Sequence, residues 1–86
     1  MPKITVYSSD YCGFCVAAHR LLRQKGIESY ETINVDGDQS LRAVMEQRSG
    51  RRTVPQIFIG DRHVGGYTDL ASLDQSGELD RLLAQA

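Results

Sequence analysis

The sequence has little of what builds several common classes of protein. Its 86 residues contain only two cysteines, too few for the several disulfides that stabilise a small secreted domain. Its two prolines and eight scattered glycines form no linker or low-complexity segment. No apolar run reaches the roughly 20 residues of a membrane-spanning helix, and the first residues show no secretion segment. We therefore expect one small domain over residues 1–86, in a reducing, by default cytoplasmic, compartment, with no membrane partner.

An excess of positive charge is also absent. Ten basic residues stand against eleven acidic ones, which gives a formal net charge of −1, and the two signs are interspersed along the chain. Because binding to nucleic-acid phosphates requires a basic face, we expect no nucleic-acid partner.

Both cysteines lie in one short stretch, Tyr11-Cys12-Gly13-Phe14-Cys15, which precedes an apolar pattern of helical spacing. Side chains three residues apart on a helix are neighbours, and a modest adjustment brings their Cβ atoms to the roughly 3.8 Å of a disulfide. A cysteine at the start of a helix also faces unpaired N–H groups and the positive end of the helix dipole, which favour a thiolate. Since the thiolate is the nucleophile, the stretch predicts a dithiol redox site.

The elements around this stretch predict an α/β fold. Residues 3–7 and 27–35 read as strands, and between them an apolar stripe through Ala18, Leu21 and Leu22 predicts a helix ending at Lys25, with Gly26 as its left-handed cap. A strand, a helix and a strand in this order form a βαβ unit, which implies a parallel pair of strands.

The second half of the chain predicts a helix, a hairpin and a C-terminal helix. Asp38 is expected to cap a helix over residues 39–49 with Leu41, Val44 and Met45 on its apolar face. Residues 56–59 and 62–65 predict an antiparallel hairpin. Thr68 is expected to cap a last helix, which residues 76–77 interrupt before it continues to the end of the chain. The sum is a mixed four-stranded sheet, two parallel strands plus the hairpin, flanked by helices.

Three motifs together resemble a known family. They are the Tyr11–Cys15 stretch, Thr53-Val54-Pro55-Gln56-Ile57-Phe58-Ile59, and Gly65-Gly66-Tyr67-Thr68-Asp69-Leu70. In this order and spacing they look like a bacterial-type dithiol glutaredoxin with a CGFC active site, a member of the thioredoxin-like superfamily. The resemblance covers nearly the whole chain, and a CxxC beside a βαβ pattern is itself typical of the thioredoxin-like class.

The resemblance implies a glutathione-dependent thiol–disulfide oxidoreductase. In such an enzyme Cys12 would be the nucleophile and Cys15 the resolving thiol, which is expected on the packed side of the helix. Its partners would be glutathione, as reductant and co-substrate, and proteins that carry a glutathione mixed disulfide or a disulfide. The resemblance requires no metal or bound organic cofactor, and we expect a monomer in the absence of ligand.

The family also implies where glutathione would bind. Pro55 would follow a cis peptide bond, which leaves the Val54 backbone free to pair with an extended peptide. The γ-glutamyl carboxylate would lie at the helix start formed by Thr68 and Asp69, where backbone donors favour an anion. The Asp69 carboxylate would take the α-ammonium, and Gly66 would allow close approach to the main chain.

The glycine carboxylate of glutathione requires a cation, for which Arg51 and Arg52 are both candidates. The expected glutathione-binding residues are Tyr11, Phe14, Arg52, Thr53, Val54, Pro55, Gly66, Thr68 and Asp69, with Arg51 as the alternative to Arg52.

Two positions depart from the family pattern. Gly13-Phe14 replaces the common Pro-Tyr pair between the cysteines, and Ser9 stands where the family often has a lysine. Gly13 also gives the motif a likeness to the CGFS branch, which favours an alternative function: a dimeric carrier in which Cys12 thiolates and two glutathiones bridge a [2Fe–2S] cluster. Cys15 argues against it, because a disulfide with Cys12 would displace the metal.

Two further alternatives are weaker. If the chain were a thioredoxin-type reductase, reduced by a flavoenzyme, the Gly65–Asp69 segment would have no evident role. A zinc site would require His19 and His63, the only histidines, which are not in finger spacing with the cysteines. We expect His19 at the helix surface and His63 as a solvated edge residue, neither with a chemical role.

Overall fold

The computed structural model describes residues 2–84. In chain order the elements are β1 (Ile4–Ser8), α1 (Gly13–Gln24), β2 (Glu31–Asn34), α2 (Gln39–Ser49), β3 (Gln56–Ile59), β4 (Arg62–Gly65), α3 (Tyr67–Ser76) and α4 (Glu78–Ala84). None of the helices in this part of the chain is long and apolar enough to cross a membrane.

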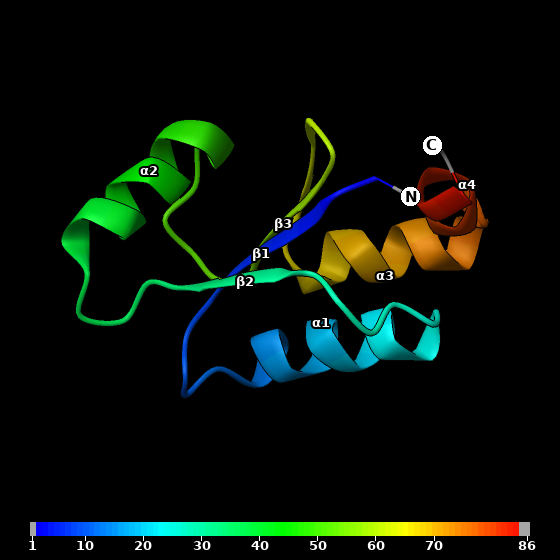
Figure 1. The fold of residues 1–86 in the computed structure, drawn as a ribbon, viewed down its shortest axis with the longest axis horizontal. Coiled ribbons are helices and arrows are strands. Elements are labelled where there is room, and N and C mark those ends of the chain that lie inside the picture. Colours follow the sequence, from blue (N-terminus) through cyan, green and yellow to red (C-terminus); the bar gives the residue numbers. More distant parts are fainter. Residues whose placement is uncertain (1, 85–86) are drawn as a thin grey trace.

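The four strands form one mixed sheet in the order β2-β1-β3-β4. β1 pairs in parallel with β2 and antiparallel with β3, and β3 pairs antiparallel with β4. The predicted βαβ unit and hairpin are thereby confirmed. Figure 1 shows α1 and α3 along one side of the sheet and α2 on the other side.

The two faces of the sheet carry separate cores, because side chains alternate along each strand. Ile4 and Val6 of β1 face the larger core, whereas Tyr7 faces the smaller one. Helices α1, α3 and α4 supply most of the larger core: Ala18, Leu21, Leu22, Leu70, Leu79, Leu82 and Leu83. On the α2 side, Met45 packs with Tyr7, Val35 and Phe58. Since Ser8 lies two residues after Val6, it faces the α1 side of the sheet.

The predicted second strand is too long. Ile27 does not lie in a strand but closes α1: its N–H donates to the carbonyl of Leu22, and the N–H of Gly26 donates to that of Arg23. This is the hydrogen-bond pattern of a helix end with a left-handed glycine, here Gly26 at φ +82°. Ile27 is buried as the apolar residue that accompanies such an ending. β2 itself is a short, mostly exposed edge strand.

Two helix details also differ from expectation. Val44 is exposed rather than part of a buried face, because α2 contacts the sheet along a narrow stripe in which only Met45 is fully covered. The cap of α3 is Gly66, not Thr68, and α3 therefore begins at Tyr67. The caps Asp38 and Gly50 of α2 are confirmed, as is the break between α3 and α4, where Gly77 is left-handed.

Candidate active site

Cys12 is the N-cap of α1, and its sulfur is part of the capping geometry. The Cys15 N–H donates to Cys12 Sγ at 3.2 Å. In the thiol form, the S–H of Cys12 donates to the Val54 carbonyl at 3.7 Å. The side chain is partly exposed. A partly exposed sulfur that accepts a backbone N–H at the positive end of a helix is suited to carry negative charge.

Cys15 differs sharply from Cys12. It is 1% exposed and packs one turn inside α1. Burial, followed by interaction with the Cys12 sulfur, raises the pKa of the Cys15 thiol, while the Ser8 hydroxyl and the Ser9 N–H oppose that rise. No disulfide joins the two cysteines in this structure. The pair therefore consists of an accessible sulfur and a buried thiol held protonated behind it, three residues away.

A groove of ≈ 430 Å³ lies next to Cys12, on the side of Val54. Its lining comprises Phe14, Arg51, Thr53, Val54, Pro55, Gly66, Tyr67, Thr68 and Asp69. The structure thus gathers most of the residues expected to bind glutathione, from the start of α1, the segment before β3 and the start of α3. Tyr67 was not foreseen, and Tyr11 and Arg52 do not line the groove.

The peptide bond between Val54 and Pro55 is cis, as the resemblance implied. Within residues 2–84 the Val54 N–H has no hydrogen-bond partner, and the Val54 carbonyl accepts a hydrogen bond only from the Cys12 thiol. The backbone at Val54 thus presents a donor and an acceptor beside the sulfur, the arrangement that an extended peptide can pair with.

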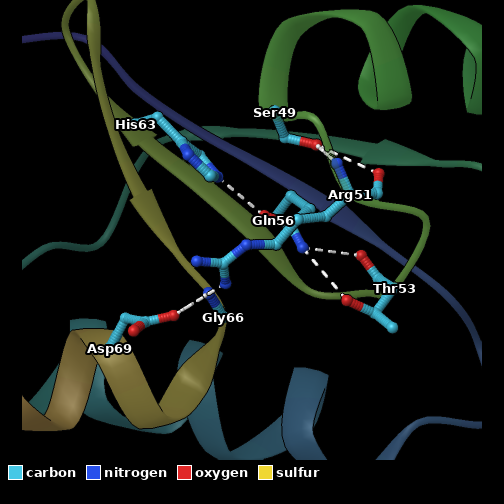
Figure 2. Close-up of polar contacts among 7 residues, drawn as sticks. All are labelled: Ser49, Arg51, Thr53, Gln56, His63, Gly66 and Asp69. Carbon is cyan, nitrogen blue, oxygen red and sulfur yellow. Dashed lines mark hydrogen bonds and ion pairs between the residues drawn. The ribbon is translucent and has the colours of Figure 1, made fainter.

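Asp69 also lines the groove, from the first turn of α3. Its Oδ2 accepts from the Gly66 N–H at 3.0 Å and from Arg51 Nη1 at 3.0 Å (Figure 2). The Gly66 N–H, followed by the Arg51 guanidinium, lowers the pKa of the Asp69 carboxyl. Asp69 is therefore ionised at neutral pH, and it ties α3 to the segment before β3.

The two adjacent arginines separate. Arg51 lines the groove and pairs with Asp69, whereas Arg52 is 83% exposed and its Nε lies 3.4 Å from Glu46 on α2. Of the two candidates for a ligand carboxylate, the structure brings only Arg51 into the groove.

Gln56 and His63 are residues that the sequence analysis did not connect with the site. Gln56 is 0% exposed, and its Nε2 donates to the Thr53 carbonyl and to Thr53 Oγ1 at 2.9 and 3.2 Å (Figure 2). Its Oε1 is 2.7 Å from His63 Nε2. His63 is therefore not the solvated edge residue we expected: it is half-buried, with its ring centroid 5.0 Å from that of Phe58. Together these contacts hold Thr53 just before Val54.

The surface around Cys12 is aromatic. Tyr11 is 99% and Phe14 64% exposed. The Phe14 ring stacks on Tyr67 with centroids 6.3 Å apart, so that the start of α1 meets the start of α3. Within residues 2–84, no three His, Cys, Asp or Glu side chains gather into a metal site.

Comparison with known proteins decides the family. A family model described as Glutaredoxin matches residues 4–64. The chain belongs to the glutaredoxin family. It is 48% identical over 83 residues to a glutaredoxin of Neisseria meningitidis, covering 96% of this chain and 98% of that protein. It is 45% identical over 83 residues to glutaredoxin 3 of Escherichia coli, with 96% and 99% covered.

Solved structures agree with this assignment. The crystal structure of a buckwheat glutaredoxin–glutathione complex superposes on this glutaredoxin with a TM-score of 0.86 at 34% identity, covering 95% of this chain and 76% of that chain. The solution structure of a glutaredoxin from Brucella melitensis gives 0.84 at 46% identity, with 96% and 89% covered. As a glutaredoxin, the chain is a thiol–disulfide oxidoreductase with the predicted thioredoxin-like fold.

Proposed function

We propose that this glutaredoxin uses glutathione to reduce protein–glutathione mixed disulfides and protein disulfides, with Cys12 as nucleophile and Cys15 as resolving thiol. The observation that carries the proposal is the position of Cys12 Sγ: at the N-terminus of α1, with the Cys15 N–H at 3.2 Å and the groove beside it. The buckwheat relative, which was crystallised with glutathione, supports glutathione as the occupant of that groove.

The reaction on a mixed disulfide consists of two exchanges. The Cys12 thiolate attacks the glutathione sulfur, a Cys12–glutathione bond forms, and the protein leaves as a thiolate with the electron pair of the broken S–S bond. A second glutathione thiolate then attacks the bound glutathione sulfur, which yields glutathione disulfide and regenerates the Cys12 thiolate. No electron carrier beyond glutathione takes part.

On a protein disulfide, the Cys12 thiolate attacks one substrate sulfur, a mixed disulfide forms, and the other substrate sulfur leaves as a thiolate with the electron pair of the broken S–S bond. Cys15 then attacks Cys12 Sγ, and the substrate sulfur bonded to Cys12 leaves as a thiolate. Two glutathiones reduce the resulting Cys12–Cys15 disulfide and become glutathione disulfide. The raised pKa of Cys15 fits this order, because a protonated Cys15 does not compete with Cys12 for substrate.

The groove residues fit the parts of glutathione. The Val54 backbone would pair with its cysteinyl residue, and the start of α3 at Thr68 and Asp69 would hold the γ-glutamyl end, the Asp69 carboxylate taking the ammonium. Gly66 would let the ligand approach the main chain. Arg51, rather than Arg52, is our candidate partner for a ligand carboxylate, because it lines the groove.

Glutathione dependence separates this function from that of a thioredoxin-type reductase. We expect reduced glutathione with glutathione reductase and NADPH to support turnover of a glutathionylated peptide. Thioredoxin reductase with NADPH should give a rate at least about tenfold lower, because the groove and the start of α3 have no role in that reaction. NADPH consumption measures both rates, and equal rates with the two electron sources would contradict the proposal.

A second candidate is favoured by the surroundings of Gly13. Gly13 is exposed, and a Cβ at this position would meet no atom within 4 Å other than those of its own chain neighbours, so the surface next to Cys12 in the sequence is open. Because Cys15 is buried, one chain offers only Cys12 as a thiolate ligand, and a [2Fe–2S] cluster would require two chains and two glutathiones. Anaerobic reconstitution with iron, sulfide and glutathione should give a brown dimer, while a colourless monomer would exclude this candidate.

A further inference from the structure

Gln56 is a polar residue at a fully buried position of the sheet, 0% exposed. It lies in β3 opposite Tyr7 of β1, which belongs to the core on the α2 side. His63 of β4 lies opposite Phe58, which belongs to the same core. Because opposite residues of paired strands share a face, Gln56 and His63 lie on the same side of the sheet. An apolar side chain would be buried there at less cost, so the amide indicates a task other than packing.

The hydrogen bonds of Gln56 determine the direction of its amide. The Thr53 carbonyl can only accept, so the group that lies 2.9 Å from it must be the NH₂ group of Gln56. The same nitrogen lies 3.2 Å from Thr53 Oγ1. The Gln56 Oε1 is left to accept from His63 Nε2, at 2.7 Å, and that ring nitrogen therefore carries a proton. Figure 2 shows Gln56 between His63 and Thr53.

His63 is itself held in place, by its contact with the Phe58 ring at 5.0 Å between centroids. Burial, followed by the charge of Arg51, lowers the pKa of His63, while the charge of Asp69 opposes that change. His63 is therefore neutral at pH 7 and puts no second positive charge beside Arg51. It offers Gln56 a donor in a fixed position.

The segment that Gln56 holds has little other support. Residues 51–55 lie in neither a helix nor a strand, and within residues 2–84 their backbone makes no hydrogen bond to another backbone group. In the same part of the chain, the only hydrogen bonds of Thr53 are those from Gln56. The next residue is Val54, whose carbonyl lies 3.7 Å from Cys12 Sγ. The Gln56 amide thus determines where the Val54 backbone lies relative to the sulfur.

We propose that Gln56 and His63 are positioning residues that make the groove selective for glutathione. They fix Thr53, and thereby the Val54 backbone, beside Cys12. The inference rests on the function proposed above, in which the Val54 backbone pairs with glutathione. Neither Gln56 nor His63 lines the groove, so both act through Thr53 and not on the ligand itself. Because a misplacement of about 1 Å can lower a rate about 100-fold, a small displacement of Val54 would weaken the selection of glutathione while the sulfur stays intact.

Two mixed disulfides of one peptide test this role. In one the peptide cysteine carries glutathione, and in the other it carries 2-mercaptoethanol, which has no peptide backbone for Val54 to pair with. The reduced enzyme is mixed with one equivalent of either substrate, and the loss of mixed disulfide in quenched samples gives the rate. We expect the wild-type chain to react at least about tenfold faster with the glutathionylated peptide. Gln56→Met should lower that rate by about 10- to 100-fold and leave the rate with the 2-mercaptoethanol disulfide unchanged.

A double variant, Gln56→Met with His63→Phe, replaces both polar partners by apolar side chains, so that neither is left buried without the other. It keeps an aromatic ring against Phe58, should show the same loss of preference, and decides the question if Gln56→Met does not fold. The matched control is Ile59→Val, a buried substitution in the same strand that faces the larger core and makes no hydrogen bond to Thr53. It should lower the stability but keep the wild-type preference for glutathione.

The outcomes separate the two proposals. The positioning role alone would be overturned if the variants kept the wild-type preference, if their rates fell equally with both substrates, or if Ile59→Val lost the preference to the same extent. A wild-type chain without a preference for the glutathionylated peptide would instead contradict glutathione as the occupant of the groove, and the positioning role with it.

Discussion

Cys12→Ser is expected to lose at least about a thousandfold in the rate of glutathionylated-peptide reduction, whereas Cys15→Ser keeps a large part of it. The reason is the difference between the two positions. Cys12 Sγ is partly exposed and accepts the Cys15 N–H at 3.2 Å, so it alone meets a substrate. Cys15 is buried, and in the proposed mechanism it acts only as the resolving thiol. The reaction on a mixed disulfide does not need that step, because a second glutathione can release the glutathione bound to Cys12.

The serine pair is well matched, since each variant replaces one sulfur by one oxygen. Serine is a favourable N-cap, so Cys12→Ser should leave the start of α1 intact. Turnover of a glutathionylated peptide with glutathione, glutathione reductase and NADPH gives the rates, and circular dichroism checks the fold. Activity that survives in Cys12→Ser, or disappears equally in both variants, would reverse or remove the assigned roles.

Gly65→Ala is expected to cost about 2–4 kcal/mol of unfolding free energy and to raise the KM for a glutathionylated peptide. Gly65 has φ +115°, a conformation that L side chains rarely adopt, and a Cβ there would lie 2.9 Å from Asp69 Cγ and 3.2 Å from Arg51 Nη1. The carboxylate of Asp69 would have to leave its place near the Gly66 N–H, which loosens the groove at the start of α3.

Gly37→Ala is the control for Gly65→Ala. Gly37 also has a positive φ, +67°, but a Cβ there meets nothing within 4 Å. Gly37→Ala should therefore lower the free energy of unfolding by about 1 kcal/mol and leave the KM for a glutathionylated peptide unchanged. Urea unfolding followed by circular dichroism gives the two free energies. If both variants lost the same free energy of unfolding and kept the wild-type KM, the close approach of Gly65 to Asp69 would have no part in shaping the groove.

The sequence predicted the fold best where an element has clear signals at both ends. α2 has Asp38 before it and Gly50 after it, and its bounds were predicted without error. The second strand was extended back to Ile27 because an apolar residue after a glycine fits a strand as well as a helix ending. The hydrogen bonds from Ile27 to Leu22 and from Gly26 to Arg23 distinguish the two, and neither contact leaves a separate mark in the sequence.

The groove was predicted where its residues lie in contiguous motifs. The choice between Arg51 and Arg52 was out of reach, because neighbouring side chains point in different directions and partners from α2 and α3 decide where each goes. His19, which we expected at the helix surface, is half-buried: its Nδ1 is hydrogen-bonded to the Tyr30 hydroxyl, and its Nε2 lies 3.4 Å from Ser8 Oγ. These contacts join three separate segments, so no local motif contains them.

The claim on which the rest depends is that one sulfur, at the tip of α1, takes up glutathione in the adjoining groove. The most direct measurement is a crystal structure of Cys15→Ser after treatment with glutathione disulfide, which leaves one glutathione on the attacking cysteine. We expect a disulfide to Cys12, the tripeptide alongside Val54, and its γ-glutamyl end at the start of α3 near Asp69. A Cys12 that stays unmodified, or a glutathione that is attached but lies outside the groove, would contradict the account.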